Sequence, residues 1–144
     1  MTDKQDQFQQ WLAEMDDALD SFFASLPKEL GARLDYTPES LDALEAWVLQ
    51  NAAGTKDLLD PKRSQQLDGI ARYIGETIRK NVGGKWEIRL DDPKYVYYGV
   101  PQLSGFAERS TPESPHSLAT ASADRRTGTY LSTIVRNMVK RYRK

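Results

Sequence analysis

The chain has 144 residues, about the length of one domain, and it has no cysteine, which excludes disulfides, thiolate metal sites and cysteine nucleophiles. Its net charge of −1 hides an asymmetry, because residues 1–60 carry 13 acidic and 4 basic side chains, whereas residues 61–144 carry 8 and 16. Such a split indicates either two binding faces or two halves that attract each other across one fold, and the second interpretation is preferred.

The first ten residues, MTDKQDQFQQ, contain neither a basic n-region nor an apolar h-region, so no secretory signal is expected. No apolar run reaches the roughly 20 residues that a membrane-spanning helix needs. The sequence therefore predicts a cytoplasmic protein with no membrane partner.

An amphipathic helix is predicted between a capping box at Thr2 and Gln5 and the helix-breaking Pro27. Its apolar residues recur at steps of three and four and form one face, which consists of Phe8, Trp11, Leu12, Met15, Leu19, Phe22, Phe23 and Leu26. The opposite face carries four aspartates, Asp6, Asp16, Asp17 and Asp20.

Two further helices are predicted, each beginning with a polar N-cap followed by proline: Thr37-Pro38 and Asp60-Pro61. The buried stripe of the first is Leu41, Leu44, Trp47 and Val48. That of the second is Leu67, Ile70, Ile74, Ile78 and Val82. Gly75 lies beside this second stripe. Because a mid-helix glycine costs about 1 kcal/mol relative to alanine, we expect the first helix or the following hairpin to pass close to it.

A β-hairpin is predicted after this helix, which Gly83 and Gly84 end. The run KWEIRL alternates apolar and polar residues, as a half-buried strand does. DDPK supplies turn residues, and YVYYGV is expected to return as the second strand before Pro101.

Residues 101–129 are expected to be largely loop, because they are rich in Ser, Pro, Gly and Thr and have poor periodicity. Residues 130–142 are predicted to form a C-terminal helix with basic side chains in its second half, where cations complement the helix dipole. The predicted fold is one compact α+β domain over residues 1–144, with three N-terminal helices, a central antiparallel hairpin or small sheet, and a C-terminal helix.

Several residues are candidates for chemistry. GGKW runs from a helix end into a strand, opposite to a phosphate-binding loop. Glu76 has Arg72, Arg79 and Lys80 one turn away, so a solvated ion-paired role is preferred over a catalytic carboxylate beside Gly75.

The single histidine, His116, is expected in a polar loop, where it is more often incidental than catalytic, because no nucleophile-elbow pattern accompanies it. With one histidine and no cysteine, a zinc site is not expected. Asp91 and Asp92 precede a proline and indicate a turn rather than a cation site. No catalytic residue, metal or cofactor is predicted.

The basic tail, RRTGTYLSTIVRNMVKRYRK, raises the possibility of nucleic-acid binding, because phosphate neutralisation and base stacking use such residues. Against it stands the pI near 5.9. The acidic first helix is also available to this tail as an internal partner.

The run YIGETIRKNVGGKW, Tyr73 to Trp86, resembles small uncharacterised bacterial proteins in which a Tyr-x-Gly-Glu helix leads into Gly-Gly-x-Trp and a strand. The similarity covers about residues 67–100. Some relatives resemble immunity proteins encoded beside secreted toxins. The resemblance implies a compact bacterial α+β domain and a binding role, and it transfers no catalytic residue.

The sequence thus favours a non-enzymatic protein-binding module, an immunity protein that neutralises a toxin by steric and electrostatic occlusion. Asp16, Asp17 and Asp20 are the predicted partner-binding residues, placed against a basic cleft of the partner. One alternative is a nucleic-acid-binding protein that uses the C-terminal helix. Another is an enzyme centred on Glu76. The oligomeric state stays open.

Overall fold

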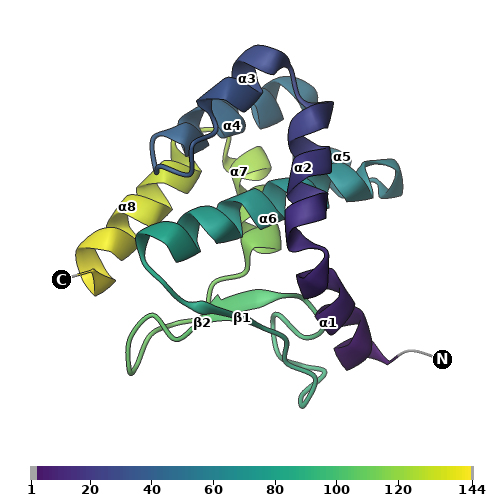
Figure 1. Cartoon of the computed structure of the whole chain (residues 1–144), viewed down its shortest axis with the longest axis vertical. Coiled ribbons are helices and arrows are strands. Elements are labelled where there is room, and N and C mark those ends of the chain that lie inside the picture. The colour runs from purple at the N-terminus through teal and green to yellow at the C-terminus, as the bar shows by residue number, and fades with distance from the viewer. Residues whose placement is uncertain (1–2, 144) are drawn as a thin grey trace.

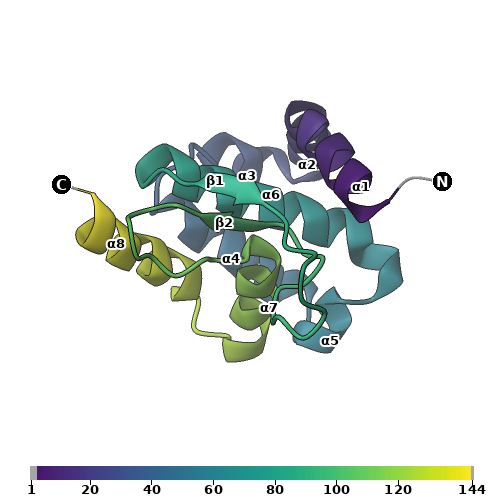
Figure 2. The same cartoon turned by 90° about the horizontal axis from the view of Figure 1, so that it is seen from below.

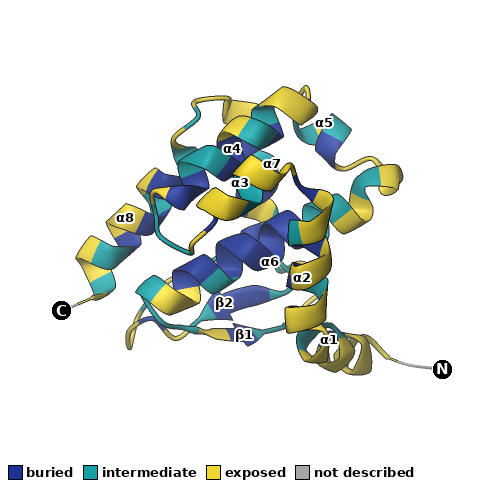
Figure 3. Cartoon of the chain, turned by 45° about the horizontal axis from the view of Figure 1, so that its top comes forward, coloured by how far each residue is buried: buried dark blue, intermediate teal, exposed yellow. Residues whose placement is uncertain are grey.

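The longest helix, α6 (Ser64–Asn81), runs through the middle of the molecule, and the other elements pack around it (Figure 1). The computed structural model describes residues 3–143. Along α6, Ile70, Ile74 and Ile78 are fully buried, as the predicted stripe requires. Its centre is buried on nearly every side (Figure 3), because helices cover one side and a small sheet covers the other.

The N-terminal segment forms two helices rather than the single helix expected: α1 (Lys4–Ala13) and α2 (Met15–Ser25), which meet at Glu14. The change of direction lets Trp11 of α1 reach α6 and α7 (Pro115–Arg125) while Phe22 of α2 packs over Gly69 of α6. Thr2, the expected cap, lies outside the described residues. The side chain of Asp3 caps α1 by accepting a hydrogen bond from the amide of Asp6 (2.8 Å).

The next segment contains two short helices that were not predicted, α3 (Lys28–Arg33) and α5 (Thr55–Leu58), on either side of α4 (Ser40–Asn51). The expected cap at Asp60 is confirmed, because its carboxylate accepts a hydrogen bond from the amide of Lys62. Thr37 Oγ1 accepts one from the amide of Ser40, but α4 begins at Ser40 and its N-cap is Glu39, so the predicted start at Pro38 is two residues too early. Pro61 begins a 3₁₀ turn, η1 (Pro61–Arg63), which continues into α6.

Two short strands lie across α6 (Figure 2): β1 (Lys85–Glu87) pairs antiparallel with β2 (Gln102–Ser104), with Trp86 opposite Leu103. An α+β fold is therefore confirmed, but the expected partner strand is wrong. The segment YVYYGV turns away from the sheet, because successive turn hydrogen bonds fold it into a loop. The turn at DDPK is confirmed, since the amide of Tyr95 donates to the carbonyl of Asp92 (2.9 Å).

The C-terminal part ends in α7 (Pro115–Arg125) and α8 (Tyr130–Tyr142), and α8 has the predicted bounds. The expectation that residues 101–129 are largely loop is correct for residues 105–114 and 126–129 but misses β2 and α7, which this range also holds. Helix α7 packs along α6, and its buried residues include the small side chains Ala119, Ser122 and Ala123. Small residues produce little contrast in hydrophobicity, so the periodicity of this helix is weak in the sequence.

Candidate functional site

The acidic residues predicted to bind a partner lie on the outside of α2. Asp16, Asp17 and Asp20 are all exposed, whereas Met15, Leu19 and Phe22 of the same helix are buried. Within residues 3–143, five arginine–carboxylate ion pairs form and His116 lies against Asp68, and none of these contacts takes a carboxylate from α1 or α2. This negative charge is therefore not neutralised by a basic side chain of the described chain.

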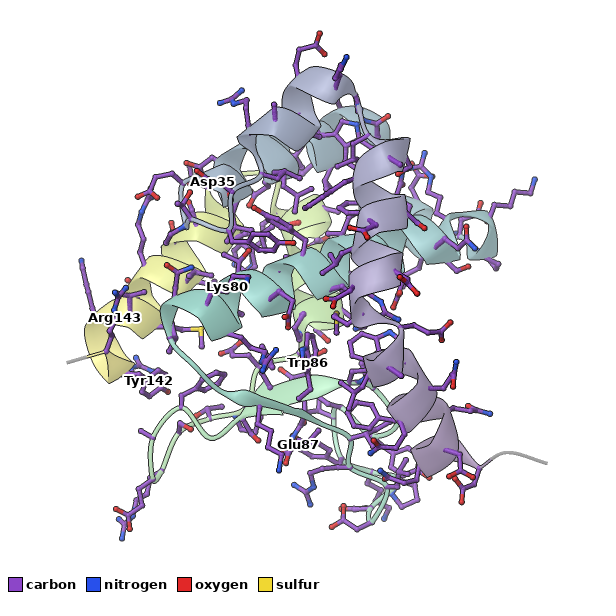
Figure 4. The ribbon with its side chains drawn as sticks, in the orientation of Figure 1. Asp35, Lys80, Trp86, Glu87, Tyr142 and Arg143 are labelled. Atoms are coloured by element: carbon purple, nitrogen blue, oxygen red, sulfur yellow. The ribbon has the colours of Figure 1, made fainter. Side chains whose placement is uncertain are left out.

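The basic residues of α8 lie on the opposite side of the molecule. Figure 1 places the C-terminus at the left and α1–α2 at the right, and Figure 4 shows Arg143 at the far end of α8. The two halves meet through only two ion pairs among the described residues, Arg63–Asp57 (3.8 Å) and Arg136–Glu39 (3.6 Å). The acidic first helices are thus not the internal partner that the basic tail was expected to have.

Glu76 is held by its neighbours. Its carboxylate accepts a hydrogen bond from the Trp86 indole (2.8 Å) and pairs with Arg79 (3.0 Å), which leaves 15% of its side chain exposed. A Cβ on Gly75 would overlap the Trp86 ring. The strand that follows α6 therefore approaches this glycine, as expected, and the Trp86 side chain occupies the space beside Gly75 (Figure 4).

Asp68, which the sequence did not single out, joins three helices. Its carboxylate accepts hydrogen bonds from Trp11 Nε1 of α1 (2.7 Å) and from Arg72 Nε of α6 (2.6 Å), and it lies 3.3 Å from His116 Nε2 of α7. Burial by itself would raise the pKa of this carboxyl, but the three hydrogen bonds and the Arg72 charge outweigh it and lower the pKa to about 2.

The guanidinium of Arg72 lies on the buried side of this cluster. It stacks 4.2 Å from the centre of the Trp11 ring and donates to the Trp11 carbonyl (2.8 Å). The Trp11 ring in turn meets the edge of Trp86. The expected i,i+4 pair between Arg72 and Glu76 is therefore replaced by one between Arg72 and Asp68. The arrangement ties α1 to the core.

His116 lies in the first turn of α7, not in the polar loop that was expected. Ser114 caps this helix by accepting a hydrogen bond from the amide of Ser117, and Pro115 occupies the first helical position. Nδ1 of His116 is buried without a hydrogen-bond partner. The sequence contained the cap-plus-proline signal at Ser114-Pro115, which could have located this helix.

Two of the hollows on the described surface are lined as follows. A groove of about 260 Å³ between α3 and α4 has an apolar lining that includes Leu30, Ala43 and Trp47. A wider, more open hollow lies around α5 and contains Asp57, Asp60 and Asp124. Within residues 3–143, no group of three or more His, Cys, Asp or Glu side chains is placed to hold a metal ion. In the same range, no helix has the length and apolar character for a membrane crossing.

No protein-family model matches the chain, and no match is found among curated proteins or solved structures.

Proposed function

We propose that this chain is a non-enzymatic, cytoplasmic protein-binding module that presents the acidic side formed by α1 and α2 to a basic protein surface. The observation that supports this proposal is the exposure of Asp16, Asp17 and Asp20 with no cation of the described chain beside them. Unpaired surface carboxylates cost little in water, and they attract a partner of opposite charge during diffusional encounter.

The partner class that fits this chemistry is a protein with a cationic cleft. An enzyme that acts on nucleic acid has such a cleft, because it must hold phosphates. A bacterial toxin of that kind, neutralised by occlusion, agrees with the resemblance of residues 67–100 to proteins that include immunity-like members. The α2 carboxylates would then occupy the place of the phosphates.

The test begins with affinity capture from the lysate of the native host, with and without nuclease, followed by identification and purification of the bound protein. The triple variant Asp16→Lys, Asp17→Lys, Asp20→Lys is then compared with the wild type in stopped-flow association. We expect the association rate constant to fall at least tenfold at low salt, because electrostatic steering is reversed.

A matched control carries the same change in net charge elsewhere. Glu29→Lys, Glu108→Lys and Asp124→Lys reverse three exposed carboxylates that lie off α1 and α2 and belong to none of the ion pairs. Thermal melts establish that both triple variants fold. Equal association rates for the two triple variants would contradict the proposal.

The second candidate function is nucleic-acid binding by α8. The observation that favours it is the exposure of Lys140, Arg141 and Arg143 away from the acidic helices. A phosphate binder loses affinity linearly with log salt, with a slope set by the number of phosphates neutralised. Absence of any retardation of RNA or DNA at low salt would dismiss this candidate.

A further inference from the structure

The segment between the two strands, residues 88–101, forms a closed loop at the edge of the sheet (Figure 1). The amide of Gly99 donates to the carbonyl of Arg89 (3.1 Å) and closes the base of the loop. Further turn hydrogen bonds join the amide of Tyr98 to the carbonyl of Tyr95 and that of Val100 to the carbonyl of Tyr97, each 3.0 Å long. Compact loops whose ends are close together are frequently functional.

Side chains fix this loop to the rest of the molecule. The hydroxyl of Tyr95 donates to the buried Gln102 of β2 (2.6 Å), and Gln102 donates in turn to Glu87 of β1. The guanidinium of Arg89 lies 4.4 Å from the centre of the Tyr95 ring. The loop is therefore held in one shape before any partner arrives, which reduces the entropic cost of binding.

The loop lies beside the beginning of α1. Lys4 Nζ of this helix lies 4.7 Å from the centre of the Tyr98 ring. The exposed charged side chains here are Arg89, Lys94, Asp91 and Asp92 on the loop, whose charges cancel, and Asp3, Asp6 and Lys4 on α1, whose charges sum to −1. The loop therefore adjoins the acidic side of α1 and α2 without adding net charge to it.

At its tip the loop presents Val96, which is 78% exposed. In residues 3–143, the other exposed large hydrophobic side chain is Leu59, which is 55% exposed and directly follows α5. Full burial of a valine side chain is worth about 1.5–3 kcal/mol. The loop also carries Tyr95, Tyr97 and Tyr98 around Val96, and tyrosine is enriched among the residues that dominate binding energy at protein interfaces.

We propose that the loop of residues 88–101 is the anchor of the protein-binding surface and that it inserts Val96 into an apolar pocket rimmed by Lys and Arg on the partner. This inference rests on the proposed function, because it takes the partner to be the same basic protein that α2 attracts. The carboxylates of α1 and α2 speed association with the partner, and Val96 slows its dissociation.

The test places an aliphatic diazirine amino acid, close to valine in size, at position 96, at position 17 or at position 59 of the full chain in cells of the native host. After irradiation, mass spectrometry identifies the cross-linked protein and the residues modified. We expect positions 96 and 17 to label the same protein, with the position-96 adduct in an apolar stretch close to Lys or Arg. Position 59 should not label that protein.

The identified protein is then purified and bound to Val96 variants. We expect Val96→Ala to weaken binding about tenfold, mainly through faster dissociation, because two methyl groups no longer enter the pocket. Val96→Asp should weaken it at least a hundredfold, and Val96→Ile should stay within about threefold. Leu59→Asp carries the same chemical change outside the surface and should have no effect.

The outcomes separate the two proposals. Labelling of a basic protein from position 17 but not from position 96, or unchanged affinity in Val96→Asp, would overturn the loop as anchor and leave the acidic surface standing. Adducts from position 96 to nucleic acid or to a second copy of the chain would also overturn it. Absence of a protein adduct from both positions would overturn the proposed function itself.

Discussion

Asp68 is the residue at which α1, α6 and α7 are joined, because one carboxylate accepts hydrogen bonds from Trp11 and Arg72 and faces His116. Its pKa is about 2 in the folded protein, compared with about 3.9 in an unfolded chain. A depressed pKa means that the contribution to stability is present above pH 4 and is lost as the pH falls from about 4 to 2.

We therefore predict that Asp68→Asn lowers the free energy of unfolding by about 1–2 kcal/mol at pH 7. The loss is no larger because the carboxylate is partly exposed and solvent screens its interactions. The difference from the wild type should shrink towards pH 2. Urea denaturation at a series of pH values measures both. Asp17→Asn, on the exposed face of α2, is the control and should change little at any pH. A stability difference between the wild type and Asp68→Asn that did not change with pH would contradict the prediction.

Gly75 lies in α6 directly against the Trp86 ring. In an open helix, Gly→Ala would stabilise the protein by about 1 kcal/mol. Here the added Cβ overlaps the Trp86 ring, so the indole must move and lose its hydrogen bond to Glu76. We expect Gly75→Ala to reduce the free energy of unfolding by about 1–3 kcal/mol, measured by chemical denaturation with tryptophan fluorescence.

Gly31→Ala is the matched comparison for Gly75→Ala. Gly31 lies in α3, and the nearest atom to its added Cβ is 4.0 Å away, at ordinary contact distance. This variant should be neutral or more stable than the wild type. If alanine stabilised both positions equally, the close packing of Trp86 against α6 would be wrong.

Among the elements, α8 depends on a carboxylate from another helix. Glu45 of α4 is completely buried and accepts hydrogen bonds from the amides of Tyr130 (3.1 Å) and Leu131 (2.8 Å), at the N-terminus of α8. These amides have no partner within the helix itself, and the positive end of the helix dipole favours the negative charge. Asp42 of α4 adds a hydrogen bond from Ser132.

We predict that Glu45→Ala costs about 3 kcal/mol of unfolding free energy, because it leaves two buried amides unsatisfied, whereas Glu45→Gln, which keeps an acceptor oxygen, costs about half as much. Urea denaturation followed by circular dichroism gives both values. Similar stability for Glu45→Ala and the wild type would show that water replaces the carboxylate and that the cap is dispensable.

The elements also show what could be predicted from sequence. The helices with large apolar side chains at steps of three and four, α4, α6 and α8, were predicted because burial alternates around each helix with the period of the sequence. Helix α7 was not, since Ala119, Ser122 and Ala123 bury a face of small residues. The segment Tyr95–Val100 has strand-like composition, but its backbone hydrogen bonds form turns, and the sheet pairs β1 with three residues further along.

The candidate site also contains residues whose placement could be predicted from the sequence and residues whose placement could not. The exposure of Asp16, Asp17 and Asp20 could be predicted, because these residues lie opposite the apolar face of their helix. The cluster around Asp68 could not, since Trp11 is 57 residues before it and His116 is 48 residues after it. Contacts at such separations depend on how helices cross, and local periodicity carries no information about crossing.

In the whole molecule, charge and apolar exposure are arranged by side. The acidic helices α1 and α2 and the Val96 loop lie together, while the basic end of α8 lies at the other side (Figure 1). Separated charges of this kind act over distances longer than a contact, up to the screening length of about 10 Å at 0.1 M salt. The exposed carboxylates act at such distances, whereas Val96 acts only in direct contact. The carboxylates and Val96 should therefore affect different steps of one binding reaction.

In complexes between oppositely charged protein surfaces, charge governs the association rate, whereas buried apolar contacts govern the dissociation rate. We expect the wild-type association rate constant with the identified partner to fall at least tenfold between about 0.02 M and about 0.5 M salt. The variant with lysine at positions 16, 17 and 20 should lose this dependence, and Val96→Ala should keep it while dissociating about ten times faster. Surface plasmon resonance across salt concentrations measures both constants. If Val96→Ala changed the salt dependence, or if the lysine variant changed mainly the dissociation rate, the carboxylates would be part of the final contact and the division between steering and anchoring would be wrong.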